Sequence, residues 1–374
     1  MRIGFSGRLL DEPQVRAGFI GCGSHSFRNI YPTFQHAPVD LVATCDLDGE
    51  RAAAFAGHFG ADASYTDFRE MLEKESLDAV FIVTSYDPSG RPLYPDLAVA
   101  AMDAGCHVFI EKPPAASCAG IERMQAAAQR NGKNVLVGLK KMFFPANEKA
   151  KELAYEPEFG KLSLATLQYP QHIPTVEQFA AYAEAGGGAL PDEARPVISF
   201  LDHLCHPASL MVELLGMPDT LSYERSSAGS GVATFTFASG IVASLALTGG
   251  ASLGGGMERT TLVSDRGRHV VVDNNIRLSY HQTPPDLGYG TSPSFYQGGP
   301  GDASTVWEPE FSLGQLYNKG LFLLGYYGEV NEFARSILEE RPPRKGTLEQ
   351  AWQVTRIFEA FAHGPGRRIT LLPL

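Results

Sequence analysis

The chain has 374 residues, of which 44% are hydrophobic and 20% charged, as is typical of a folded globular protein of about two domains. Its 31 basic and 42 acidic residues give a formal net charge of −11, which argues against binding nucleic acid or an anionic membrane through the overall field. The five cysteines are widely spaced and form no CxxC pair, which argues against a disulfide framework and against a cysteine zinc site.

The sequence carries no sign of export or of membrane insertion. No apolar run approaches the ~18 residues that span a bilayer. Residues 1–14 lack the long apolar region of a signal peptide, and we expect them to form an extension ahead of the first strand. A cytoplasmic protein is predicted.

The first third of the chain alternates short apolar runs with helical stretches. The predicted strands are Val15–Ile20, Val39–Cys45, Ala79–Thr84, His107–Ile110 and Val135–Gly138. The predicted helices are one from about Ser26, then Gly49–Phe59, Asp96–Ala104 and Ile121–Asn131. Strands separated by helices of this length are typical of βαβ units, so we predict a parallel sheet covered on both faces.

After about residue 142 the pattern changes to strand candidates in which apolar and polar residues alternate or the apolar run is long. Following a predicted helix at Pro145–Ala154, the strand candidates are Leu162–Tyr169, Val232–Ala238, Ile241–Thr248, Thr260–Ser264, His269–Val272 and Ile276–Tyr280. The Ala238-Ser239-Gly240 sequence between two of them is a hairpin signal. Residues 284–320 are expected to form a long loop, followed by helices near 328–340 and 347–362.

A glycine-rich turn follows the first strand and opens a helix. Residues Gly21–Ser26 read GxGxxS, in which the first glycine permits a tight turn and the second lets backbone approach a pyrophosphate at the helix N-terminus. The third position needs only a small residue, which Ser26 satisfies. Asp46 ends the second strand at a spacing that suits a carboxylate accepting the ribose hydroxyls. This context predicts a dinucleotide site.

Asp46 also bears on the choice of cofactor. A carboxylate repels a 2′-phosphate, and the neighbours Leu47 and Asp48 offer no cation to receive one. NAD is therefore predicted in preference to NADP. The alternative is that Asp46 caps the next helix.

Together these patterns predict an α/β protein in two domains. The first, residues 1–142, is a Rossmann NAD-binding domain. The second, residues 143–374, is an α+β domain for substrate binding and oligomerisation, with a large, mainly antiparallel sheet.

Three further segments carry a family resemblance. They are Glu111–Pro113 after a strand, Gly138–Pro145 at the entry to the second domain, and Asp202–His206 running into an apolar helix. With the glycine turn, they resemble the Gfo/Idh/MocA oxidoreductase family over nearly the whole chain. The resemblance implies a catalytic Lys112 in a Lys-Pro bond that is usually cis, together with Asp202 and His206.

The chemistry of these residue types agrees with that implication. Lys112 follows a strand end, where an ammonium can polarise a hydroxyl and stabilise developing oxyanion charge. Beside a positively charged nicotinamide its pKa should be lowered. Asp202 and His206 are spaced i, i+4, so the carboxylate can orient the imidazole. His206 is then the predicted general base.

The chain departs from the usual family pattern, GGGxLxDxGxH. Gly186–Asp192 reaches an aspartate, but Pro196 stands where the histidine is expected, and the DxxxH pattern follows only after Glu193–Leu201. Asp192 and His203 therefore remain alternatives to Asp202 and His206. Two further departures, Ser209 for an aspartate and Tyr94 for a histidine, change the crevice walls and leave the substrate open.

The candidate site residues fall into two sets. Expected cofactor contacts are Gly21, Gly23, Ser24, His25, Ser26, Asp46, Thr84, Ser85, Glu111, Lys112 and Lys140. Expected substrate contacts are Lys112, Lys141, Tyr169, Asp202 and His206. Lys140 and Lys141 are interpreted either as partners of an acidic substituent on the substrate or as a solvated pair or cofactor contact.

The leading functional hypothesis is an NAD-dependent dehydrogenase or ketoreductase acting on a ring hydroxyl or ketone of a sugar, cyclic polyol or sugar derivative. The alternatives are an NAD-dependent glycoside hydrolase of the same fold and a non-catalytic dinucleotide sensor. The expected partners are a small carbohydrate and further copies of the chain. A homodimer or homotetramer is predicted through an open sheet face supplied by Val232–Phe237 and Ile241–Leu247.

Overall fold

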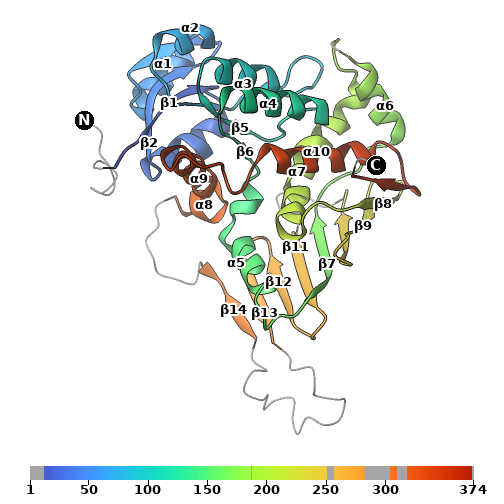
Figure 1. The fold of residues 1–374 in the computed structure, drawn as a ribbon. Helices are drawn as coiled ribbons and strands as arrows, with labels where there is room; N and C mark the ends of the chain where they lie inside the picture. The colour runs from blue at the N-terminus through green and yellow to red at the C-terminus, as the bar shows by residue number, and fades with distance from the viewer. Residues whose placement is uncertain (1–11, 187, 251–256, 283–303, 310–317, 373–374) are drawn as a thin grey trace, which may run out of the picture.

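Two β-sheets organise the chain (Figure 1). The structure, a computed structural model, describes residues 12–186, 188–250, 257–282, 304–309 and 318–372. A six-stranded sheet is built from the first part of the chain and a nine-stranded sheet from the second. The predicted fold, a Rossmann-type parallel sheet followed by a mainly antiparallel one, is confirmed.

The first sheet is parallel throughout, in the order β3-β2-β1-β4-β5-β6. Its strands are β1 Val15–Ile20, β2 Val39–Cys45, β3 Ala63–Tyr65, β4 Ala79–Ile82, β5 His107–Glu111 and β6 Val135–Gly138. The strand order reverses between β1 and β4, and a crevice for a ligand is expected outside the carboxyl ends of the strands at that point.

Helical segments cover both faces of this sheet. They are η1 Ser26–Ile30, η2 Tyr31–Gln35, α1 Gly49–Phe59, α2 Phe68–Lys74, α3 Tyr94–Asp103 and α4 Cys118–Asn131. The helix expected from Ser26 is a short π-helix that continues as a 3-10 turn. Tyr31 from this segment stacks on Phe19, with ring centroids 3.9 Å apart.

Two helices from the end of the chain return to the first sheet (Figure 1). They are α9 Tyr326–Leu338, which follows the short α8 Lys319–Leu323, and α10 Leu348–Phe361. Phe333 of α9 lies edge-on to Phe81 of β4, with ring centroids 5.4 Å apart. The two sheets thus fall on either side of residue 142, but the C-terminal helices complete the core of the first.

The second sheet runs in the order β14-β13-β12-β11-β7-β10-β9-β8-β15. Its strands are β7 Leu162–Tyr169, β8 Thr220–Arg225, β9 Gly231–Thr236, β10 Val242–Leu247, β11 Arg259–Ser264, β12 His269–Asp273, β13 Arg277–His281, β14 Thr305–Trp307 and β15 Arg368–Thr370. The pairing of β7 with β10 is parallel and the other pairings are antiparallel. The predicted hairpin joins β9 to β10, where the Phe237 amide donates to the Ile241 carbonyl at 3.2 Å. Most of the loop expected at 284–320 lies outside the described residues.

One face of this sheet packs against helices. The remaining helical segments are η3 Lys140–Phe143, α5 Pro145–Ala154, α6 Val176–Glu184, η4 Asp192–Ala194 and α7 Arg195–Leu215. Alternate side chains of β9 and β10, such as Phe235 and Leu245, are fully buried, whereas Val232 and Val242 on the other face are exposed. The strand alternation therefore divides a covered face from an open one.

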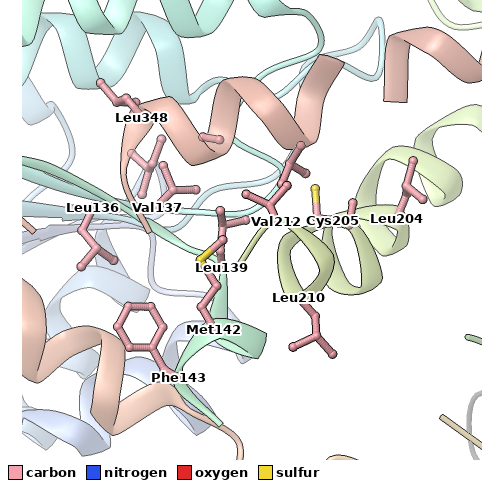
Figure 2. Close-up of a cluster of buried hydrophobic side chains, with 14 of the residues drawn as sticks. Leu136, Val137, Leu139, Met142, Phe143, Leu204, Cys205, Leu210, Val212 and Leu348 are labelled. Atoms are coloured by element: carbon pink, nitrogen blue, oxygen red, sulfur yellow. The ribbon is translucent and has the colours of Figure 1, made fainter. Parts of the chain in front are cut away.

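A buried cluster fixes α7 against the end of β6 (Figure 2). Side chains from β6 and η3 meet side chains from α7 and the start of α10; those labelled are Leu136, Val137, Leu139, Met142, Phe143, Leu204, Cys205, Leu210, Val212 and Leu348. Because interiors are close-packed, this cluster holds α7 at one position relative to the carboxyl edge of the first sheet. Side chains on α7 can therefore meet side chains at the ends of β4 and β5.

The structure adds two observations on the classes considered from composition. Within the described ranges, no helix has both the length and the apolar character required to cross a membrane. All five cysteines are buried free thiols.

Candidate active site

The glycine turn after β1 has the close approach that a dinucleotide site requires. The Gly21 amide donates to the Cys45 carbonyl at 2.8 Å. Its φ is +104°, and a Cβ added there would lie 1.9 Å from the Val83 carbonyl oxygen, so only glycine fits. At Gly23 an added Cβ meets nothing within 4 Å, so the backbone there faces open space. Ser26 is fully buried, as expected of a small packing residue.

Asp46 is held at the end of β2 by backbone donors. Its Oδ2 accepts from the Cys22 amide at 2.8 Å and its Oδ1 from the Asp48 amide at 3.0 Å. The N-cap of α1 is Asp48, which accepts from the Arg51 amide at 3.1 Å. The capping role considered for Asp46 is therefore filled by its neighbour.

Arg51 corrects the expectation that no cation stands near Asp46. Its guanidinium lies 3.8 Å from the Asp46 carboxylate and 2.9 Å from that of Asp48. The residues next to Asp46 in the chain, Leu47 and Asp48, carry no positive charge. The first turn of α1 brings Arg51 back over the strand end, which adjacency along the chain does not reveal.

Two neighbouring cavities meet at the end of β4. The first, here called the glycine-turn cavity, has a volume of about 850 Å³ and is lined by Gly21, Gly23, Asp46 and Arg51 among others. Thr84 and Ser85 line both it and a second cavity. The Thr84 Oγ1 is buried with no hydrogen-bond partner among the described residues. An open glycine turn, a ribose-side carboxylate and an orphaned hydroxyl fit a dinucleotide lying across this edge.

The second cavity, here called the lysine cavity, has a volume of about 220 Å³. Its lining residues are His25, Val83, Thr84, Ser85, Tyr86, Pro92, Tyr94, Glu111, Lys112, Pro113 and Asp202. The Lys112 Nζ, from the end of β5, lies 2.8 Å from the Asp202 Oδ1 of α7. Lys112 and Asp202, two predicted site residues that lie far apart in the sequence, are thus in contact. The Lys112-Pro113 bond is cis, as the family resemblance implied.

The protein's own charges set the ionisation of Lys112. Burial acts to lower its pKa, but the carboxylates of Asp202 and Glu111 outweigh burial and raise the pKa above the ordinary value. The expected lowering considered only the charge of a nicotinamide. That expectation concerns a bound nicotinamide and stays a prediction; among the charges of the chain itself, a carboxylate in contact with the ammonium raises the pKa.

Glu111 forms the buried floor of the lysine cavity. Its carboxylate lies 3.1 Å from the His25 Nε2 and accepts from the Lys112 amide at 3.0 Å. Burial acts to raise its pKa, but the hydrogen bond from His25 and the charges of Lys112 and Lys140 bring the pKa below its ordinary value. His25 and Glu111, two of the expected cofactor contacts, therefore lie in the lysine cavity and not among the residues that line the glycine-turn cavity. Ser24 is exposed, and its carbonyl accepts from Arg28 at 3.2 Å.

The expected pairing of Asp202 with His206 is wrong. The Asp202 Oδ1 accepts from Lys112 and also from the Tyr86 hydroxyl, at 3.0 Å. Its Oδ2 lies 3.7 Å from the His203 Nδ1. The i, i+4 spacing places Asp202 and His206 on one side of α7, but the opposite charge of Lys112 across the cavity draws the carboxylate away from the imidazole.

His206 lies one turn further along α7 in a cationic environment, where it is half-buried and is not among the residues that line the lysine cavity. Its ring centroid is 6.1 Å from that of Tyr169, an expected substrate contact that is itself buried. Burial, followed by the charges of Lys112, Lys140 and Lys141, lowers the pKa of His206 well below 6.5. Its imidazole is therefore neutral at neutral pH and able to accept a proton.

The structure also shows where Asp192 and His203, the alternatives to Asp202 and His206, lie. The Asp192 side chain is 88% exposed on η4, 2.8 Å from Arg195. The His203 Nδ1 lies 2.8 Å from the Ser199 carbonyl. The Glu193–Leu201 stretch, interpreted as an interruption, mostly forms the first turns of the same helix, so Asp202 reaches the lysine cavity and Asp192 does not.

Lys140 and Lys141 do not form a solvated pair. The Lys140 Nζ donates to the Tyr326 hydroxyl of α9 at 2.7 Å. Lys141 is buried and donates to the Glu258 carboxylate, and burial lowers its pKa to about 8. Lys141 is not among the residues lining the lysine cavity. Its expected substrate contact is replaced by a structural pair, because Glu258 reaches it from the second sheet.

Comparisons with known proteins identify a family and several similar chains. Residues 15–139 match the Gfo/Idh/MocA family model, described as an oxidoreductase family with an NAD-binding Rossmann fold. The chain is 29% identical over 152 residues to an inositol 2-dehydrogenase of Salmonella paratyphi B, covering 39% of this chain and 43% of that protein. It is 26% identical over 203 residues to D-xylose 1-dehydrogenase (NADP(+)) 2 of Haloferax volcanii, covering 54% of this chain and 58% of that protein.

The matches to these two curated relatives thus span about half the length of each. The fold extends further: a dehydrogenase of Chromobacterium violaceum has a TM-score of 0.76 at 22% identity, covering 95% of this chain and 96% of that one. The family resemblance inferred from the sequence is confirmed.

The glycine turn gives a direct test of the dinucleotide site. Gly23→Val should abolish NAD binding measured by calorimetry and leave the melting temperature unchanged, because the side chain enters open space that the pyrophosphate would fill. Gly57→Val is the matched control, since a Cβ there also meets nothing within 4 Å but lies on α1 away from both cavities. Wild-type affinity in a folded Gly23→Val protein would remove the dinucleotide assignment.

Proposed function

We propose that this member of the Gfo/Idh/MocA oxidoreductase family is an NAD-dependent dehydrogenase or ketoreductase that acts on a ring hydroxyl or ketone of a sugar, cyclic polyol or sugar derivative. The observation that carries the proposal is the contact between Lys112 and Asp202 in a cavity that shares Thr84 and Ser85 with the glycine-turn cavity. A hydroxyl held by Lys112 would then lie beside the edge where a dinucleotide fits. Dehydrogenases of inositol and xylose among the relatives support the substrate class.

Each polar residue has a distinct role in this proposal. Bound NAD supplies a hydride acceptor. Lys112, kept charged by Asp202, donates a hydrogen bond to the substrate oxygen and stabilises the negative charge that develops on it. Asp202 holds the ammonium in place. Neutral His206 accepts the hydroxyl proton during oxidation and returns it during reduction.

Incubation with NAD and a panel of free sugars, cyclic polyols, acidic sugars and glycosides tests the reaction class. The proposal expects net NADH formation with at least one free sugar or polyol. Aglycone release without net NADH would instead identify a glycoside hydrolase. NAD binding without either product would identify a dinucleotide sensor.

The proton acceptor is tested by His206→Ala. Loss of a general base should lower kcat by about 10²–10⁴-fold while NAD still binds. The pKa of His206 in the folded protein lies well below 6.5. The wild-type oxidation rate should therefore decline only below pH 6.5, where His206 becomes protonated, and should stay constant above that pH.

Two variants check the choice of residues in this test. The kcat of His203→Ala and of Asp192→Asn should remain near that of the wild type. The His203 imidazole contacts a backbone carbonyl, and the Asp192 side chain is exposed. The assignment is overturned if either control abolishes turnover while His206→Ala remains active.

The preference for NAD rests on the charge of Asp46. Asp46→Asn retains an oxygen to accept from the Cys22 amide but removes the repulsion of a 2′-phosphate, and leaves Arg51 nearby as a cation. We expect the ratio of kcat/KM for NADP to that for NAD to rise roughly tenfold or more. Adding Arg51→Ala should reverse most of this gain. A wild-type protein more efficient with NADP would contradict the proposal.

We further propose that a second copy of the chain covers the open face of the nine-stranded sheet. Leu164 and Val242 are register partners on the parallel strands β7 and β10, and both project from that face, 39% and 41% exposed. Val232 on β9 adds a third exposed apolar side chain. Val232 pairs with Ala246, four residues along β10 from Val242, so exposed apolar side chains stand at both ends of this face. Large apolar side chains on an open sheet face favour association with another protein surface.

Val242→Lys tests this assembly. Sedimentation velocity at micromolar concentration should show a wild-type dimer or tetramer, and the variant should shift to monomer because it buries a charge in the contact. Val176→Lys is the matched control, since Val176 is 43% exposed at the start of α6. A monomeric wild type would refute the proposed contact.

A further inference from the structure

Tyr86 is a polar residue of the lysine cavity that sequence reasoning did not select. It lies four residues after the end of β4 and lines the cavity together with Lys112 and Asp202. Its hydroxyl donates to the Asp202 Oδ1 at 3.0 Å, and the Lys112 ammonium donates to the same oxygen at 2.8 Å. One carboxylate oxygen of Asp202 therefore accepts hydrogen bonds from both the Tyr86 phenol and the Lys112 ammonium.

The phenol is a permanent donor in this arrangement. Burial, followed by the charge of Asp202, raises the pKa of Tyr86 far above its ordinary value. Tyr86 therefore keeps its proton throughout the working pH range, and an ionised carboxylate can only accept. A hydrogen bond to a charged acceptor is stronger than one between neutral groups, so it fixes the orientation of the Asp202 side chain.

The turn that follows Tyr86 is built to hold a fixed shape. The Asp87 Oδ1 accepts from the Ser89 amide at 2.8 Å, from the Ser89 hydroxyl at 2.6 Å and from the Arg91 amide at 2.9 Å. Tyr86 itself forms an isolated β-bridge with Pro92, which closes the base of the turn. The phenol is therefore presented by a turn whose backbone is internally bonded.

The same turn is fastened to the second domain. The Leu190 amide donates to the Pro88 carbonyl at 3.0 Å, and the Tyr182 hydroxyl donates to the Gly90 carbonyl at 3.2 Å. Gly90 has a φ of +73°, and a Cβ there would lie 2.3 Å from the Ile198 Cδ1 of α7. The turn therefore packs directly on the helix that carries Asp202, so Tyr86 and Asp202 are positioned by one continuous contact.

We propose that Tyr86 is a positioning residue of the active site, which holds Asp202 in the orientation that places Lys112 against the substrate hydroxyl. This inference rests on the proposed dehydrogenase function. Tyr86 acts through Asp202, so its contribution exists only when Asp202 is present.

Tyr86→Phe removes the hydroxyl and keeps the ring. We expect kcat for the best substrate of the sugar and polyol panel to fall about 10- to 100-fold, the range for losing a hydrogen bond to a charged group. The dissociation constant for NAD should stay unchanged, because Tyr86 does not line the glycine-turn cavity. Tyr223→Phe, which loses a 2.8 Å hydrogen bond from a buried tyrosine to the Phe361 carbonyl outside both cavities, should keep wild-type kcat.

A double-mutant cycle distinguishes positioning from a structural role. In an Asp202→Ala background, Tyr86→Phe should cause no further loss of kcat, since the acceptor it positions is gone. A purely structural role predicts that the two losses multiply. The inference is overturned by multiplying losses or by a wild-type kcat in Tyr86→Phe. A wild-type protein that forms no NADH with any substrate overturns the proposed function instead.

Discussion

The ion pair between Lys112 and Asp202 is the constraint on which the site depends. Its two charges come from the end of β5 and from α7, and their side chains are only 16% and 26% exposed. A partly buried charge that loses its partner is costly, on the order of 3–5 kcal/mol when burial is complete. The pair therefore ties the packing of α7 against the first sheet, through the cluster of Figure 2, to the shape of the lysine cavity.

The charged groups around this pair act differently on Lys112 and on His206. Carboxylates at Glu111 and Asp202 keep Lys112 protonated, while burial and the nearby lysines keep His206 neutral. A charged ammonium and a neutral imidazole supply a donor and a proton acceptor at the same pH. The two residues differ in protonation because carboxylates lie beside Lys112, whereas the charges near His206 are those of lysines.

Much of this arrangement was predictable from the sequence. The apolar periodicity located β1, β2, β6, α1, α5 and β7 at their observed bounds, because each contributes a regular buried face. The family resemblance of Glu111–Pro113 and Asp202–His206 implied that Lys112 and Asp202 share a site, and the two are in contact. These features depend on local pattern and on strand ends, which sequence reports directly.

The contacts that sequence did not predict are long-range pairings. Tyr86 reaches Asp202 across 116 positions and Lys140 reaches Tyr326 across 186, and neither pair has a local signal. Arg51 was missed because a helical turn, and not adjacency, brings it to Asp46. Short elements such as β3 and α2 were missed because three and seven residues carry too little periodicity.

The central claim is that this protein transfers a hydride from a ring carbon of the substrate to the nicotinamide of NAD. It is tested most directly with a sugar or polyol that carries deuterium at the carbon to be oxidised. The account predicts that each turnover leaves one deuterium on the reduced nicotinamide and forms one ketone. Turnover that retains the label in the product and forms no net NADH would contradict it.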